Sequence, residues 1–242
     1  MARKEIKAKG WEPPAFCKGL DCPPYTVERV VDGIELRKYA KGTWVSTDIE
    51  GVNYREALRK GFMTLFDYIS GSNSEKKKIE MTAPVRTTLK PGPGPLCQQF
   101  TVSFFLPYEY QEAGNAPEPS KKGVYLDEAP TMEVYVGSYG GFSSEDTVVE
   151  EAGRVIDTLK KNGLKYDASL WYGAGYDAPF QAQLAQLKAW LEEQQHQHLT
   201  RHSRVHVPPA LYTAYYIAGF NDAHRCGAYT EPECLKCWQL GK

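Results

Sequence analysis

Long hydrophobic runs are missing from this sequence. Its most apolar late segment, residues 211–220, is about half as long as the roughly 20 apolar residues that a membrane-spanning helix requires. The first ten residues are charged and no apolar stretch follows them, so no secretory signal is recognisable. Asn-x-Ser/Thr glycosylation sites are absent as well. We therefore expect a chain without a membrane span that works in the cytoplasm, with mitochondria as the alternative location.

An excess of charge of one sign is also missing. Lys and Arg number 29 against 30 Asp and Glu, which leaves a formal net charge of −1. Nucleic-acid-binding proteins usually carry a basic surplus, because they must neutralise phosphates. The balance argues against DNA or RNA as a partner. A hydrophobic content of 42% over 242 residues is enough to bury a full core.

Common catalytic motifs are absent. The sequence has no G-x-S-x-G, no H-E-x-x-H and no P-loop, and its five histidines all lie at or after position 196. We therefore expect neither enzymatic activity nor a metal site. Two alternatives stay open. One is a hydrolase that uses Glu80 or Asp177 as a base, by analogy with other duplicated folds. The other is a metal held by His198, His202 and His206, which are spaced four apart.

Cysteine is scarce in the middle of the chain. Five of the six cysteines lie in the terminal segments, and Cys97 is the exception. Without a secretory signal, reduced thiols are expected rather than disulfides. Cys234 and Cys237 form a C-x-x-C pair that lacks the second pair of a zinc site, so we interpret them as unliganded thiols.

A pattern of strands around a helix is present twice. The first copy has two strands joined by the hairpin signal Asp32-Gly33, and a helix that begins at Asn53 with Glu56 three residues later. Its strands are predicted at residues 25–30, 34–39, 43–49, 78–88 and 100–106. The second copy has a helix capped by Ser143 and strands at residues 124–126, 132–139 and 166–176.

The two copies are predicted to form one α+β domain. Neither has enough strands to cover its helix alone, so both should share a curved antiparallel sheet. Residues 1–24 are predicted to be an extended N-terminal arm and residues 25–207 the domain itself. An inserted helix is expected at 181–200. Residues 208–242, rich in Tyr and Cys, are expected to form a tail outside the domain.

Several segments together resemble a known family. They are Ile34-Glu-Leu-Arg-Lys-Tyr39, Trp44-Val-Ser-Thr47, Gly61-Phe62 with Tyr68-Ile69, Lys78-Ile-Glu-Met-Thr-Ala-Pro-Val85, Gly140-Gly-Phe-Ser-Ser144 and Ala174-Gly-Tyr-Asp-Ala-Pro-Phe180. With them the chain resembles the SOUL/heme-binding-protein family from about Tyr25 to Phe180. The resemblance implies a distorted antiparallel β-barrel of two pseudo-symmetric strand-helix-strand halves. The motif of the family's last strand is matched only in part here, by Arg201–His206.

The resemblance also implies a tetrapyrrole site between the first helix and the loop that leads to the last strand. A porphyrin needs an apolar surface for its flat face and cations for its propionates. Candidate contacts on the helix are Arg55, Arg59, Phe62, Met63 and Phe66, and those on the loop are Tyr176, Pro179 and Phe180. Arg59 is the best propionate partner. In the alternative reading, Phe62 and Phe66 only hold the helix on the sheet, and the basic residues are a solvated face.

The expected function is non-enzymatic, non-covalent binding of heme or a porphyrin, for sequestration or transport. The region of resemblance contains no histidine, so the iron should be ligated weakly or not at all. The resemblance implies one alternative of another class. This is a protein-interaction module linked to mitochondrial permeability and cell death, whose second helix, residues 147–161, docks a partner.

Overall fold

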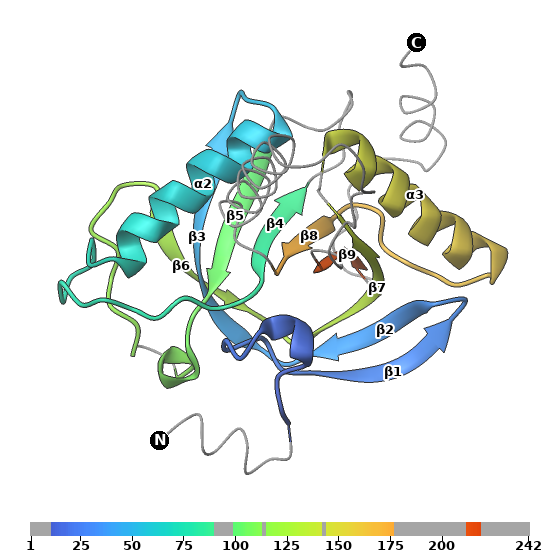
Figure 1. Cartoon of the computed structure of the whole chain (residues 1–242), viewed down its shortest axis with the longest axis horizontal. Helices are drawn as coiled ribbons and strands as arrows, with labels where there is room; N and C mark the ends of the chain where they lie inside the picture. The colour runs from blue at the N-terminus through green and yellow to red at the C-terminus, as the bar shows by residue number, and fades with distance from the viewer. Residues whose placement is uncertain (1–10, 90–98, 113–114, 142–143, 177–211, 219–242) are drawn as a thin grey trace, which may run out of the picture.

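The structure, a computed structural model, describes residues 11–89, 99–112, 115–141, 144–176 and 212–218, the last range by its backbone alone. The strands in these ranges are β1 (Tyr25–Val31), β2 (Ile34–Tyr39), β3 (Gly42–Glu50), β4 (Val85–Leu89), β5 (Gln99–Phe105), β6 (Val124–Ala129), β7 (Met132–Gly140), β8 (Trp171–Gly175) and β9 (Tyr212–Ala218) (Figure 1). The helices are α2 (Tyr54–Ile69) and α3 (Glu145–Lys161), with short 3-10 helices η1 (Ala15–Cys17) and η2 (Tyr108–Tyr110).

All nine strands belong to one sheet. Their order is β1-β2-β7-β9-β8-β4-β5-β3-β6, and each neighbouring pair is antiparallel. Among the described residues no pairing joins β1 to β6. The predicted α+β class with an antiparallel sheet is therefore confirmed, whereas the predicted closure into a barrel is not.

The two halves of the sheet have the same arrangement. In the first half α2 connects β3 to β4, and β5 lies between these two strands. In the second half α3 connects β7 to β8, and β9 lies between them. The halves meet where β4 pairs with β8. The internal duplication inferred from the sequence is thus visible in the topology.

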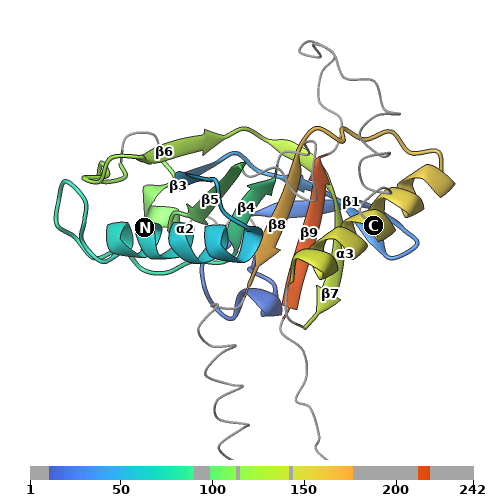
Figure 2. The same ribbon diagram turned by 90° about the horizontal axis from the view of Figure 1, so that it is seen from above.

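The sheet has two different faces, because successive side chains of a strand point to opposite sides. On β4, Val85 and Leu89 pack under the helices, whereas Arg86 points to the other side. Both α2 and α3 lie on the first side, which we call the helix face (Figures 1 and 2). The second side, the inner face, lines a cavity and carries residues including Arg37, Trp44, Arg86, Phe105 and Tyr172.

The two helices begin at capping side chains. Asn53 accepts a hydrogen bond from the Glu56 backbone at 2.9 Å, as the sequence predicted. For α3 the cap is Ser144, which accepts from the Thr147 backbone at 3.1 Å, so the prediction of Ser143 was wrong by one residue.

Neither described helix has the length and apolar character that crossing a membrane requires.

Residues 11–24 are packed against the inner face. The predicted extended arm, residues 1–24, is therefore wrong for this part of it. Cys17 and Cys22 are buried and joined by a disulfide, so the expectation of reduced thiols is wrong for this pair. Trp11 adds edge-on ring contacts with two tyrosines. Apolar side chains without any period can still anchor a segment, and an analysis of periodicity does not detect them.

The strand β9 corrects the predicted end of the domain at residue 207. It pairs with β7 on one side and with β8 on the other, so it lies inside the sheet. Part of the segment 208–242, predicted to be a tail outside the domain, is therefore a strand of the domain. The helix predicted at 181–200 falls outside the described residues.

Candidate functional site

The helix α2 is held on the sheet by a closely packed apolar side. Leu65 and Ala57 are completely buried, and so is nearly all of Tyr68. Gly61 lets the helix approach β5, because a Cβ at this position would lie 2.4 Å from Cγ2 of Val102. This packing fixes which side of α2 is turned away from the sheet.

The side that is turned away carries four of the five helix residues predicted to contact a tetrapyrrole, and the fifth, Phe62, lies at its edge and packs against Phe104 of β5 at a centroid distance of 5.2 Å. Arg55, Arg59, Phe62, Met63 and Phe66 fall within roughly a third of the helix circumference. Met63 is 41% exposed and Phe66 is 43% exposed, whereas Phe62 is buried. The rings of Phe62 and Phe66 stack with centroids 6.0 Å apart and an interplanar angle of 13°. An apolar surface therefore runs from the core to solvent, and we call these five residues the α2 face.

Two exposed arginines adjoin this surface. Among the described residues no ion pair engages Arg55 or Arg59. The ammonium of Lys60 instead binds the Glu56 carboxylate at 2.8 Å. This hydrogen bond lowers the pKa of the Glu56 carboxyl. Within the described residues, Arg55 and Arg59 are thus the cations of α2 that a carboxylate from outside can meet.

The α2 face fits the general needs of a tetrapyrrole. A flat ring could cover Met63 and Phe66, while its propionates meet the adjoining arginines. Met63 also offers a thioether sulfur, which is one of the axial ligands found on heme iron. All five histidines lie outside the described residues, and so does the alternative metal site at His198, His202 and His206.

The three loop residues predicted for the same site are not brought to the α2 face by the described structure. Tyr176 is buried on the inner face, where its ring meets Phe16 edge-on at a centroid distance of 4.7 Å. Tyr172 and Ala174 point to the same side as Tyr176. Pro179 and Phe180 lie outside the described residues.

The apolar side of α3, which the alternative hypothesis offered to a protein partner, is occupied. Its five buried apolar residues pack in the core on the helix face: Val148, Ala152, Val155, Ile156 and Leu159. The outward side is charged, and it includes an ion pair between Arg154 and Glu151 at 2.8 Å. Docking of α3 in an apolar partner groove would therefore require the helix to leave the sheet.

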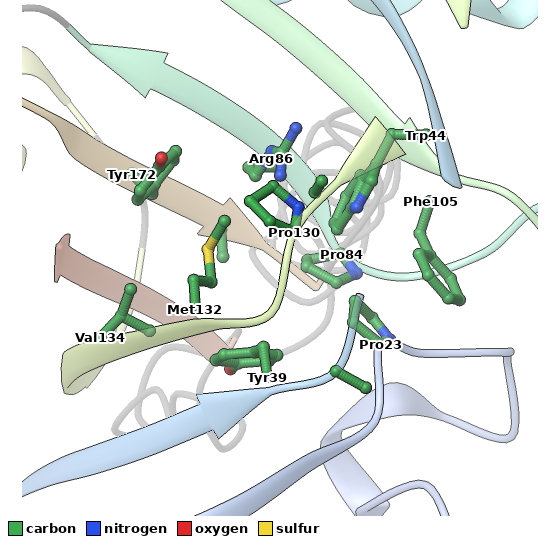
Figure 3. Close-up of a pocket in the computed structure, with 13 residues that line it drawn as sticks. Pro23, Tyr39, Trp44, Pro84, Arg86, Phe105, Pro130, Met132, Val134 and Tyr172 are labelled. Carbon is green, nitrogen blue, oxygen red and sulfur yellow. The ribbon is translucent and has the colours of Figure 1, made fainter. Parts of the chain in front are cut away.

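A cavity on the inner face was missed by the analysis of the sequence. Its walls come from β2, β3, β4, β5, β6, β7, β8 and the segments beside them (Figure 3). Arg86 and Trp44 lie against each other there, with the guanidinium carbon 4.0 Å from the centre of the indole ring. Strand alternation predicts only that Arg86 and Val85 point to opposite sides. It does not say that residues so far apart in the chain converge.

Comparison with known proteins assigns the fold to a family. The sequence model of the SOUL heme-binding protein family matches residues 20–192. The chain belongs to this family. Heme-binding protein 2 of Homo sapiens is 31% identical over 191 residues, which cover 78% of this chain and 87% of that protein. The mouse protein of the same name (Mus musculus) is 32% identical over 72% of this chain and 86% of its own length. The resemblance found in the sequence is confirmed.

Related proteins extend beyond this pair. Heme-binding protein 1 of Mus musculus is 29% identical over 65% of this chain and 82% of that protein. Among solved structures, the EcmrR–DNA complex determined by cryo-electron microscopy aligns with 90% of this chain and 63% of its own, at a TM-score of 0.50. The sequence identity in that alignment is 9%, so the likeness concerns the fold alone.

Proposed function

We propose that this protein binds heme or a related tetrapyrrole, non-covalently, on the α2 face. The observation that carries the proposal is the exposure of Met63 and Phe66 next to Arg55 and Arg59 on one side of a rigidly packed helix. Large apolar side chains that are exposed together often mark a binding surface. The names of the family and of its heme-binding relatives support the choice of ligand.

The proposed affinity comes mainly from apolar contact. Complete burial of one Phe or Met side chain contributes about 1.5–3 kcal/mol, and an exposed ion pair contributes about 1 kcal/mol or less. The two arginines therefore orient the propionates more than they hold the ring. If heme is bound, Met63 is the residue of the α2 face whose sulfur would hold its iron.

The role that follows is to hold the ligand rather than to transform it. Sequestration or transport in the cytoplasm is the form of this role that we propose, with mitochondria as the alternative location. The names of the relatives describe binding and no reaction, which supports a role without catalysis.

A hemin titration of the purified full-length protein, followed by the Soret absorbance, tests the proposal. Arg59→Glu should weaken binding about tenfold, since it reverses a charge beside a propionate; tenfold corresponds to about 1.4 kcal/mol. Met63→Asp should abolish binding by placing a carboxylate under the ring. Met63→Leu should keep the affinity within about threefold and shift the Soret band if sulfur ligates the iron.

Arg29→Glu is the matched control, because it makes the same charge change on the exposed edge strand β1. Its affinity for hemin should equal that of the unmodified protein. The proposal fails if hemin does not saturate the protein, or if correctly folded Met63→Asp binds it unchanged.

A further inference from the structure

The cavity on the inner face has a composition that differs from the α2 face. It is partly open to solvent. Among the residues that the structure describes, its lining is apolar and aromatic with a single charged side chain: Pro23, Tyr39, Ala40, Trp44, Pro84, Arg86, Phe105, Ala129, Pro130, Met132, Val134, Tyr172 and Ala174. Figure 3 shows Arg86 between Trp44 and Tyr172, with Met132 and Val134 on the near wall. Both halves of the duplicated fold contribute to these walls.

Arg86 is held in this cavity by its neighbours. Its guanidinium carbon lies 4.0 Å from the centre of the Trp44 ring and 5.7 Å from that of Tyr172. Nη2 donates to Asp127 at 3.0 Å and to Ser103 at 3.4 Å. The side chain of Arg86 is only 11% exposed, so these contacts hold a cation inside an apolar enclosure.

The hydrogen bonds described for Arg86 leave part of its guanidinium unused. Nε is buried and has no acceptor among the described residues. The partner carboxylate of Asp127 is 37% exposed, so it stands at the edge of the enclosure, where water screens its charge. Burial lowers the pKa of Arg86, and an anion next to it would oppose this effect. Nη1 likewise donates to no described residue and, unlike Nε, is not sealed from solvent, so a second acceptor in the cavity would complete the site.

We propose that this cavity binds a small, flat aromatic monocarboxylate. The carboxylate would accept hydrogen bonds from the Arg86 guanidinium, whose planar donors match carboxylate geometry. The ring would lie among the apolar and aromatic walls, because aromatic rings attract one another when they stack or meet edge-on. One cation, already shared with Asp127, suits a single negative charge better than a phosphate dianion, which the apolar walls would desolvate.

This site is separate from the proposed tetrapyrrole site. Arg86 points to the inner face, whereas its neighbour Val85 packs in the core beneath α2. Figure 2 shows α2 on one side of the strands, and the cavity lies on the other side, so the sheet separates the two sites. The inference goes beyond the proposed function, and the two can fail independently.

Calorimetric titration of the full-length protein with 2-naphthoate tests the proposal. The unmodified protein should bind one equivalent, and 2-naphthamide, which has the same shape without the charge, should bind at least tenfold more weakly. Arg86→Gln should lose at least tenfold in affinity for the carboxylate and little for the amide. Arg29→Gln, on the exposed strand β1, is the matched control and should bind as the unmodified protein does.

A second variant covers the case in which Arg86→Gln does not fold. Ala40 is exposed and lines the cavity, so Ala40→Trp should obstruct it without disturbing the core. Loss of 2-naphthoate binding in this variant, with unchanged hemin binding, supports the proposal. The proposal is overturned if 2-naphthoate does not saturate the protein, or if folded Arg86→Gln and Ala40→Trp bind it normally. It is equally overturned if hemin displaces 2-naphthoate and Arg86→Gln loses both, because one shared site would then explain the data.

Discussion

Gly61 shows how strongly a single residue can position the proposed tetrapyrrole site. An added Cβ would lie 2.4 Å from Val102, a distance that real structures do not tolerate, and the β-branched Val102 is buried in β5. We expect Gly61→Ala to lower the free energy of unfolding by about 1–3 kcal/mol, as overpacking does. Gly153→Ala on α3 is the matched control, because its added Cβ meets open space. It should stabilise by about 0.5–1 kcal/mol. Urea unfolding measures both, and equal effects would contradict this account.

Some single residues could be predicted because their signals are local. Asp32 and Gly33 both have positive φ angles, 47° and 80°, which is the turn that the Asp-Gly pair indicates. The cap of α3 was misplaced for a local reason too. Ser143 and Ser144 are identical and each precedes acidic residues, so the sequence around them does not distinguish the two positions.

At the scale of elements, the local sequence pattern does not predict β9, whereas the internal duplication implies a strand at its place. In the first half, β5 follows β4 after a long connection and fills the place between β3 and β4. The second half needs a counterpart between β7 and β8. Two segments of the sequence could fill this place, the partial match Arg201–His206 and the apolar segment at 211–220, and the strand that the structure describes lies in the second. A pairing partner far along the chain is decided by topology, not by the segment itself.

A truncation series tests the place of β9. A chain that ends at residue 207 should lose the fold, since β7 and β8 would each lose a hydrogen-bonded neighbour. A chain that ends at residue 220 keeps all nine strands and is expected to fold. Far-UV circular dichroism and size-exclusion chromatography distinguish a folded monomer from an unfolded or aggregated chain. A well-folded product ending at 207 would remove β9 from the essential sheet.

At the scale of the whole molecule, the two candidate sites differ in how far the sequence could lead to them. The α2 face lies on one helix, so helical spacing groups Arg55, Arg59, Met63 and Phe66 without knowledge of the rest of the fold. Tyr176 does not lie with them. Side chains alternate along β8, and this alternation places Tyr176 on the inner face. The cavity draws its walls from at least six segments, and only the assembled sheet brings them together.

The whole molecule should unfold as one unit, because α2, β4 and β5 each contribute to the two clusters that form the core on the helix face. Leu65→Ala on α2 and Leu159→Ala on α3 remove fully buried side chains, so each should lower the free energy of unfolding by about 2–5 kcal/mol. The exposed Met63→Ala should change it by no more than about 0.5 kcal/mol. For each variant, urea transitions followed by tryptophan fluorescence and by far-UV circular dichroism should coincide. Two separated transitions in either leucine variant would mean that each half of the duplication is stable alone, and a shared core would then not be what joins the two halves of the sheet.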